Sequence, residues 1–457
     1  MSDYRILTVV GTRPEIIKMV PVIRALEKRA SVELVIVHSG QHYDSEMSQV
    51  FFDELGLRKP DVDIGVGSGT HAQQTSKMLE EFEKVIEHFD PKLVLAEGDT
   101  NTVVAASLAA IKIHVPFGHV EAGLRCYDRM MPEEINRVIA DQCAQLCFAP
   151  TNKSALNLLR EGIYPYRIFV TGNTVVDACL ENLKKAEQSS KIMTKLDLNH
   201  KRPIVLLTLH RSENVDDVHK LQSIMEAALQ LNECTIVYPV HPRAQKNIAT
   251  TGLIHDLEKA EHICLTRPLG YFDFLCLLSK SLFVLTDSGG VQEEAVTLRI
   301  PCLTLRHSTE RPETVSVGAN IIVGTETSRI LYLSRKLLNE PKTLRLMKTI
   351  NNPLGDGRAG ERIAEICVEA CEQGLTVESP AYYETGSADY VSIEVPRGLI
   401  GKDIMFLQTD HPSVLVTNVY DSKGTPLFPR PDLKLGKKWL ISLFGPLNEI
   451  EGLRKMT

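Results

Sequence analysis

Short apolar runs alternate with stretches of helical period along most of this chain, and this alternation occurs in two successive series. In the first series we expect strands at residues 6–10, 33–38, 93–96, 115–120 and 146–149, with helices at 16–28, 73–87 and 133–143 between them. In the second series we expect strands at residues 204–209, 235–239, 263–265, 282–286 and 301–305. Short β runs separated by helices are typical of parallel, doubly wound sheets. The fold class is therefore α/β, with two Rossmann-like domains facing each other across a cleft.

The length of 457 residues suggests about three domains at roughly 150 residues each. We expect a first Rossmann-like domain at 1–173, a second at 174–357 and a closing helix at 358–378 that completes the second domain or crosses back to the first. The polar stretch 184–202 reads as an outer connection, and 379–387 as a linker rich in Pro, Tyr, Gly and Ser. A small α+β domain follows at 387–457, with strands at 390–395, 414–419 and 439–444 and a terminal helix at 446–455. At about 70 residues its core is marginal alone, so we expect it to dimerise or dock.

Composition restricts the class of protein. Hydrophobic residues make up 43% and charged residues 24% of the chain, as in ordinary globular proteins. The net charge of −7 implies no broad basic surface for nucleic acid, and no apolar stretch is long enough to span a bilayer. Ten cysteines occur without a C-x-x-C motif, and the pairs Cys143/Cys147 and Cys367/Cys371 are spaced for helix packing. We expect a cytoplasmic protein without a signal peptide, structural zinc or membrane partner.

A phosphate site is indicated at residues 11–18, between the first strand and the first helix. Gly11 permits a sharp turn, and Pro14 suits the first turn of a helix. Arg13 and Lys18 add cations near a helix N-terminus, which itself attracts anions. The alternative is an ordinary βα turn with solvated charges.

Acidic residues follow other strands of the first series. Asp99 and Glu121 come directly after strands, and Glu133 and Glu134 begin a helix. The carboxyl ends of parallel strands form one rim, where α/β enzymes place their sites. The alternative for each acid is capping or stabilising a first helical turn, which is the commoner role of such residues.

The second series repeats the strand–glycine–helix arrangement. His210 and His241 each follow a strand, and Asp287 begins a run that opens a helix. In that run Ser288, Gly289 and Gly290 would let a phosphate or ribose approach the backbone, and Glu294 lies one turn further on. A diphosphate held between the two domains satisfies both glycine turns.

The runs 11–18, 118–125, 132–137, 210–214, 287–294 and 310–313 resemble the non-hydrolysing UDP-N-acetylglucosamine 2-epimerases, over roughly residues 5–372. That family has a glycosyltransferase-B-like (GT-B-like) fold and interconverts UDP-N-acetylglucosamine (UDP-GlcNAc) and UDP-N-acetylmannosamine (UDP-ManNAc) without a metal or nicotinamide cofactor. The resemblance implies a nucleotide-sugar substrate and a homodimer. It implies catalytic roles for Asp99, Glu121, Glu133 and His210. It implies UDP contacts from Arg13, Lys18, His210, Phe274, Ser288, Gly289, Gly290, Glu294 and Arg311.

A second UDP-GlcNAc site activates some bacterial members of that family. Gln41, His42, Arg137, Arg211 and His241 match positions of this effector site. Asp44 stands where those enzymes have glutamine, and the loop between Glu121 and Glu133 is two residues shorter than in many bacterial members. Whether substrate activates this chain therefore stays open.

The tail, residues 391–456, is similar to the C-terminal regulatory domain of RCK-type potassium-transport regulators, which commonly dimerise and bind small ligands. We expect a regulatory or dimerising role and a small-molecule effector for it.

Three other functions remain open. A GT-B glycosyltransferase shares the fold but needs an acceptor, and a hydrolysing 2-epimerase would release free sugar and UDP. A nucleotide-sugar sensor would bind without turnover.

Overall fold

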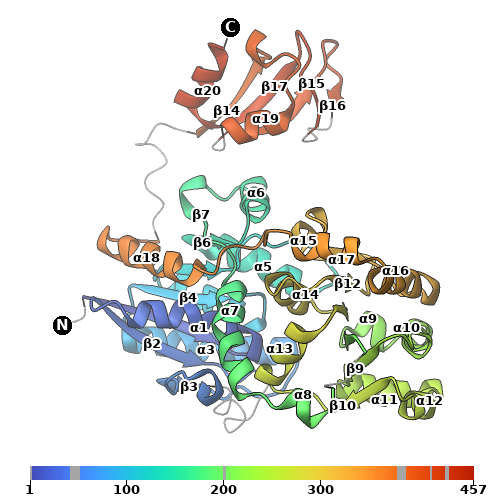
Figure 1. Ribbon diagram of the computed structural model, residues 1–457. Helices are drawn as coiled ribbons and strands as arrows, with labels where there is room; N and C mark the ends of the chain where they lie inside the picture. Colours follow the sequence, from blue (N-terminus) through green and yellow to red (C-terminus); the bar gives the residue numbers. More distant parts are fainter. Residues whose placement is uncertain are drawn as a thin grey trace. The chain divides into compact units, whose positions relative to one another are not determined.

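The computed structural model describes residues 3–41, 52–198, 202–377, 388–411, 414–427 and 432–456 (Figure 1). The chain divides into two compact units, Met1–Asn157 with Ile168–Leu375, and Leu158–Arg167 with Thr376–Thr457. No helix in the described part of the chain is long and apolar enough to cross a membrane.

A seven-stranded parallel sheet forms the first half of the larger unit, in the order β3-β2-β1-β4-β5-β6-β7. Its strands are β1 (Tyr4–Val10), β2 (Val32–His38), β3 (Val62–Asp63), β4 (Leu93–Glu97), β5 (Phe117–Val120), β6 (Leu146–Ala149) and β7 (Ile168–Val170). The five predicted strands are confirmed, and the short edge strands β3 and β7 were not predicted. The central strands β4, β5 and β6 are buried along their whole length, as parallel strands covered on both faces must be.

Helices connect and cover these strands. They are α1 (Arg13–Glu27), α3 (His71–Phe89), α4 (Asn101–Lys112), α5 (Pro132–Cys143) and α6 (Asn152–Arg160). Helix α4 packs between α3 and α5, whereas α1 packs against α7 (Thr174–Ser189) and α18 (Ala359–Glu372). The prediction that Cys143 and Cys147 share a helix is wrong, because α5 ends at Cys143 and Cys147 lies in β6. Cys367 and Cys371 do share α18 and are buried there.

A six-stranded parallel sheet forms the second half of the larger unit, in the order β10-β9-β8-β11-β12-β13. Its strands are β8 (Ile204–Thr208), β9 (Thr235–Pro239), β10 (Ile263–Thr266), β11 (Phe283–Thr286), β12 (Cys302–Thr304) and β13 (Asn320–Ile322). Its helices are α9 (Ser212–Val215), α10 (Val218–Gln230), α11 (Pro242–Thr251), α12 (Ile254–Lys259), α13 (Tyr271–Lys280), α14 (Gly289–Thr297), α15 (Pro312–Ser316), α16 (Thr327–Asn339) and α17 (Pro341–Lys348). Two parallel α/β domains are thus confirmed, whereas the exact boundaries at 173, 357 and 387 stay predictions.

Two connections join the α/β domains. Helix α7 continues to Ser189 and is followed by the short helix α8 (Ile192–Lys195), whose Ile192 is buried, so the described part of the predicted connection, 184–198, is largely helical and contributes to the core. Helix α18 crosses back onto α1 (Figure 1). Gly360 permits this contact, since a Cβ there would lie 2.7 Å from the Pro21 carbonyl carbon.

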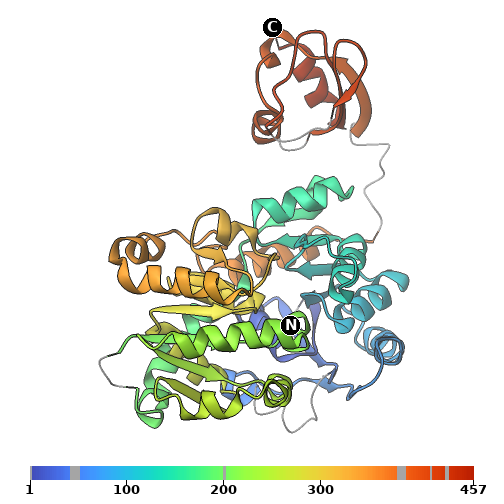
Figure 2. The same cartoon turned by 90° about the vertical axis from the view of Figure 1, so that its right-hand side faces the viewer.

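The smaller unit contains an antiparallel sheet in the order β14-β17-β15-β16, coloured orange to red in Figures 1 and 2. Its strands are β14 (Ala388–Glu394), β15 (Leu415–Tyr420), β16 (Pro426–Leu427) and β17 (Leu440–Pro446). Helices α19 (Ile404–Asp410) and α20 (Leu447–Arg454) accompany it, and Leu399, Ile404, Leu443 and Leu453 are among its core residues. The α+β character of this region is confirmed, although α19 was not predicted. The predicted linker at 379–387 lies outside the described residues.

Candidate functional site

The turn between β1 and α1 requires glycine because other side chains fill the space around it. A Cβ on Gly11 would lie 2.3 Å from both Ser39 Oγ and Thr102 Oγ1. Helix α1 then begins at Arg13, with Pro14 in its first turn as predicted. The close approach of neighbouring turns therefore explains this glycine.

Glu15 joins two neighbouring turns of the first sheet. Its Oε2 accepts hydrogen bonds from the backbone N–H of Gly11 (2.5 Å) and Thr12 (2.9 Å), and its Oε1 accepts one from the Thr100 hydroxyl. The side chain is buried, and burial raises the pKa of Glu15 to about 7. Sequence reasoning missed this residue, although a Glu three positions after Thr12 is the signature of a capping box.

Lys18 points at two carboxylates. Its Nζ lies 2.6 Å from Glu121 Oε2 and 3.0 Å from Glu97 Oε1. Burial opposes a charge on Lys18, but Glu121 and Glu97 outweigh it and raise the pKa of the ammonium above its usual value. In this structure the predicted phosphate ligand Lys18 is thus held by the acids of β4 and of the turn after β5.

Glu121 is held by both α/β domains. Its Oε1 accepts a hydrogen bond from Asn173 Nδ2 (3.1 Å) and lies 3.5 Å from Arg311 Nη2. Burial disfavours its charge, yet Lys18 and Arg311 hold the pKa of Glu121 below its ordinary value. Its backbone φ of 72° lies in the left-handed region, where a non-glycine residue is held only by its surroundings. Such strain at a buried carboxylate is typical of functional sites.

Glu293 and Arg311 complete this cluster from the second domain. Arg311 Nε donates a hydrogen bond to Glu293 Oε1, and Asn173 Nδ2 donates to the same oxygen at 3.1 Å. Asn173 therefore bridges Glu121 and Glu293, and its Oδ1 also caps α7 by accepting from Val175 N. Neither Asn173 nor Glu293 was singled out from the sequence.

Asp99 and Glu133 line one cavity of about 400 Å³ in the first domain. Asp99 Oδ2 lies 2.5 Å from Arg137 Nη2, and Arg137 Nη1 lies 2.7 Å from Glu134 Oε2. Gln41, from the predicted effector set, lines the same cavity as the predicted catalytic residues Asp99 and Glu133. The polar side chains His71, Asn101 and Asn136 also line it.

A buried network lies behind these acids. His119 Nδ1 lies 2.6 Å from Asp141 Oδ1, and His119 Nε2 lies 2.8 Å from the Gly98 carbonyl oxygen. Asp141 Oδ2 accepts hydrogen bonds from Arg125 Nη2 (2.6 Å) and from Gly123 N (3.2 Å). The turn that carries Glu121 is thereby attached to α5 and to the turn before Asp99.

His210 is oriented by Asp287 in the second domain. His210 Nδ1 lies 3.1 Å from Asp287 Oδ1, and Asp287 also accepts from the backbone N–H groups of His210 and Arg211. Asp287 is fully buried, whereas the His210 side chain is 42% exposed, so the imidazole is fixed on one edge and open on the other. Burial and the nearby His210 lower the pKa of His241, which caps α11.

The predicted nucleotide residues lie around the start of α14. Ser288 is the N-cap of this helix, a Cβ on Gly289 would be in van der Waals contact with Arg311 and Glu310 at 3.8 Å, and the Cβ position of Gly290 has open space. Burial raises the pKa of Glu294 to about 7, while Arg13 of the first domain acts against that rise. The Arg13 guanidinium lies 6.0 Å from the centre of the Tyr271 ring, and Phe274 is half-buried in the same helix α13.

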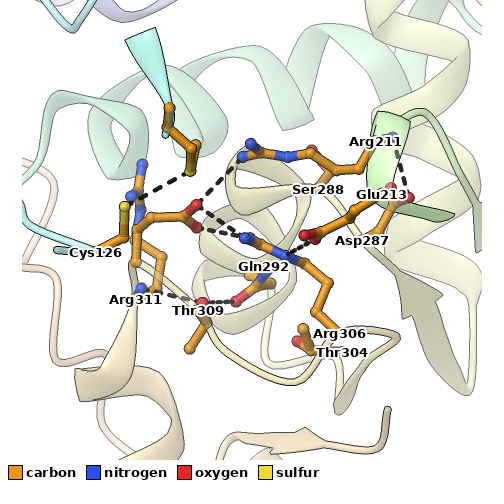
Figure 3. A network of polar contacts seen from close by, with 12 residues as sticks. Cys126, Arg211, Glu213, Asp287, Ser288, Gln292, Thr304, Arg306, Thr309 and Arg311 are labelled. Atoms are coloured by element: carbon orange, nitrogen blue, oxygen red, sulfur yellow. Dashed lines mark hydrogen bonds and ion pairs between the residues drawn. The ribbon is translucent and has the colours of Figure 1, made fainter. Parts of the chain in front are cut away.

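A network of arginines and acids supports this region (Figure 3). Arg306 donates hydrogen bonds to Glu310 and Glu213, and Arg211 Nη2 lies 3.6 Å from Glu310 Oε1. Burial opposes the charge on Glu310, but Arg306 and Arg211 lower its pKa to about 2. Figure 3 also shows the backbone N–H of Arg311 donating to Thr309, whose hydroxyl donates to Gln292.

Residues 24–368 match the family model described as UDP-N-acetylglucosamine 2-epimerase. The chain belongs to this 2-epimerase family. Among curated relatives, the UDP-N-acetylglucosamine 2-epimerase of Methanocaldococcus jannaschii is 46% identical over 362 residues, which are 78% of this chain and 97% of that protein. The UDP-2,3-diacetamido-2,3-dideoxy-D-glucuronate 2-epimerase of Pseudomonas aeruginosa is 40% identical over 368 residues, covering 79% of this chain and 98% of that protein.

A solved structure of the M. jannaschii 2-epimerase, in complex with UDP-GlcNAc and UDP, superposes with a TM-score of 0.72 at 45% identity. It covers 80% of this chain and 99% of that one. About four fifths of this 2-epimerase family member thus covers nearly the whole of these relatives, and the family model ends before residues 388–456, which carry the antiparallel sheet.

The structure brings several predicted site residues together. Lys18, Glu121 and Arg311 meet in one cluster, Asp99 and Glu133 line one cavity, and His210 is held by Asp287, the residue before Ser288. The predicted effector residues separate into two groups, Gln41 and Arg137 in the first domain and Arg211 and His241 in the second. His42 and Asp44 lie outside the described residues.

Proposed function

We propose that this protein catalyses the reversible epimerisation of UDP-GlcNAc at C2 to give UDP-ManNAc. The observation that carries the proposal is the group of acids at the strand ends of the first domain, within a chain 46% identical to a 2-epimerase. The substrate would lie in a cleft between the two α/β domains, the first contributing the acids and the second the nucleotide contacts.

The chemistry requires more than one acid. The hydrogen on C2 is weakly acidic, so its removal becomes feasible when UDP leaves C1 and a 2-acetamidoglucal forms. The gluco and manno sugars carry this hydrogen on opposite faces, which one fixed side chain cannot easily serve. Asp99, Glu121 and Glu133 would supply the proton acceptors and donors. UDP then adds back to C1 after a proton is delivered to the other face of C2.

The departing UDP gains negative charge and needs donors already in place. Arg13, the exposed edge of His210 and the N-terminus of α14 at Ser288–Gly290 fit this role. Phe274 would stack on uracil and Glu294 would bind the ribose hydroxyls. Arg311 serves both requirements, because its guanidinium lies 3.5 Å from Glu121 and 3.8 Å from the Cβ position of Gly289 at the start of α14.

A second sugar substrate has specific support. The relative from P. aeruginosa acts, by its name, on a diacetamido uronate and is 40% identical over almost its full length. The same C2 chemistry applies to both sugars. UDP-2,3-diacetamido-2,3-dideoxy-D-glucuronate is therefore assayed beside UDP-GlcNAc, and the kcat/KM ratio assigns the substrate.

The C-terminal unit is proposed as a regulatory or dimerising domain. The support is its separate core, its RCK-like sequence motifs and its position beyond residues 24–368, which the family model matches. Substrate activation through Gln41, Arg137, Arg211 and His241 stays a proposal of the same kind.

NMR of UDP-GlcNAc with the protein in deuterated water tests the proposed function. We expect UDP-ManNAc without an acceptor, with deuterium incorporated at C2 of both sugars. Asp99→Asn, Glu121→Gln and Glu133→Gln should lose at least about a hundredfold in rate while still binding UDP. Free sugar would indicate a hydrolysing enzyme, turnover only with an acceptor a glycosyltransferase, and binding without turnover a sensor.

A further inference from the structure

Five charged side chains form one buried cluster around Glu121. The exposed fraction of each side chain is 12% or less: 12% for Lys18, 2% for Glu97, 6% for Glu121, 0% for Glu293 and 9% for Arg311. Three of them are carboxyls and two are cations. If every group were ionised, the cluster would carry one surplus negative charge in a place with little access to water.

An uncompensated buried charge is costly, so one of the three carboxyls should hold a proton. Glu121 receives Lys18 at 2.6 Å and Asn173 at 3.1 Å, and Glu293 receives Arg311 and Asn173. Glu97 shares the Lys18 ammonium, at 3.0 Å, with Glu121, and the neighbouring Glu121 carboxylate disfavours a charge on Glu97. Burial also raises the pKa of Glu293, but Arg311 and Lys18 both act against that rise, whereas Lys18 alone acts against it at Glu97, whose charge therefore has the least support.

The electrostatic surroundings agree with this assignment. Burial raises the pKa of Glu97 well above its ordinary value, Lys18 acts against that rise, and the neighbouring carboxylates Glu121 and Glu15 add to it. For Glu121 the balance is reversed, because Lys18 and Arg311 outweigh the effect of burial and lower its pKa. A protonated Glu97 donating to an ionised Glu121 satisfies both groups.

We propose that Glu97 is a positioning residue for Glu121: it carries the proton that keeps the cluster neutral, so that Lys18 stays directed at Glu121 and no surplus negative charge faces an incoming diphosphate. The proposal rests on the proposed function, since it concerns the same site. Its structural basis is that Glu97 ends β4 and Glu121 follows β5, two adjacent strands that share the Lys18 ammonium.

Loss of this proton should weaken binding of the anionic substrate. As the pH rises and Glu97 ionises, the cluster gains negative charge, and KM should increase by up to about tenfold per pH unit. Glu97→Gln remains neutral at every pH. Its amide oxygen can accept from Lys18 and its N–H can donate to Glu121, so the geometry is kept.

The experiment measures kcat and KM for UDP-GlcNAc across the alkaline pH range in wild type, Glu97→Gln and Glu33→Gln. Glu33 pairs with Arg5 on the surface and its side chain is 46% exposed, so it is a matched control for the loss of a carboxylate. We expect KM to rise with pH in wild type and in Glu33→Gln, and to stay flat in Glu97→Gln. Infrared difference spectra should show a protonated carboxyl band that Glu97→Gln lacks and Glu33→Gln keeps.

Equal KM profiles in wild type and Glu97→Gln, or an unchanged carboxyl band in Glu97→Gln, would overturn the proposal. If Glu97→Gln does not fold, the pH dependence of KM in the wild-type protein tests the proposal, because a KM that does not change at alkaline pH contradicts it. A wild-type protein that never turns over UDP-GlcNAc would instead refute the proposed function, and the infrared comparison would still report on Glu97.

Discussion

Replacing Glu15 by glutamine should remove a pH-dependent loss of stability. The pKa of Glu15 is raised from 4.5 to about 7 by burial. Because this pKa is higher in the folded state than in the unfolded state, protonated Glu15 adds to the free energy of unfolding below pH 4.5. This contribution is lost as the pH rises to about 7. The shift of about 2.5 units corresponds to roughly 3 kcal/mol, at about 1.4 kcal/mol per unit.

The hydrogen bonds of Glu15 show why glutamine is the right replacement. One oxygen, Oε2, accepts from both backbone N–H groups, of Gly11 and Thr12, and a glutamine oxygen can do the same. The other oxygen accepts from the Thr100 hydroxyl. A glutamine amide can donate to that hydroxyl once it rotates, so the neutral side chain keeps every contact.

Urea unfolding of both proteins at several pH values between about 4.5 and about 8 checks this. Far-UV circular dichroism follows the whole chain, whereas fluorescence of Trp439, the only tryptophan, follows the C-terminal unit and is an internal control. The free energy of unfolding of Glu15→Gln relative to wild type should rise by about 3 kcal/mol across this interval. The pKa of Glu294 is also raised to about 7, but Glu294 is present in both proteins, so its contribution cancels in the difference between them. A difference that does not change with pH would refute the reasoning.

Three further predictions concern the nucleotide site, the helix that crosses back and the C-terminal unit. Arg13→Ala should weaken UDP binding by roughly 1.5–3 kcal/mol, the scale of a charge-assisted hydrogen bond, and unchanged affinity in calorimetry would exclude Arg13 from the site. Gly360→Ala should lower the free energy of unfolding by about 1–3 kcal/mol, and with it the melting temperature, since its Cβ would collide with Pro21. Gly452→Ala, which has open space around it, should not lower the melting temperature and serves as its control. Deletion of residues 388–457 should leave an active 2-epimerase but change its oligomeric state in size-exclusion chromatography, and a folded, inactive product would show that the C-terminal unit completes the site.

The longer strands and the helices α1, α3, α5, α18 and α20 could be predicted because their signals are local. A buried parallel strand such as β4 or β6 reads as a short apolar run, and a helix such as α5 begins with proline and acidic residues. The positions of Asp99, Glu121 and Ser288 followed from the same pattern, because polar residues directly after buried strands must lie at the carboxyl edge of the sheet. Short elements such as β3 and α19 were not predicted, because they contain too few residues to show a clear hydrophobic period.

The partners of these residues depend on contacts between distant parts of the chain. Lys18 and Glu121, which form an ion pair, are 103 residues apart in the sequence. Asn173 and Glu293, which form a hydrogen bond, are 120 residues apart. No local sequence pattern predicts either pair. The same residue types could equally have been solvated charges or helix caps. Helix α7 packs against α1 of the first domain and against α13 and α14 of the second. The charged groups are buried where the two domains meet, and there each carboxylate must find a cation, a donor or a proton. Tertiary burial, which a periodic pattern does not contain, therefore decides which buried acids, such as Glu121, are held in the charged form and which, such as Glu15, have a raised pKa.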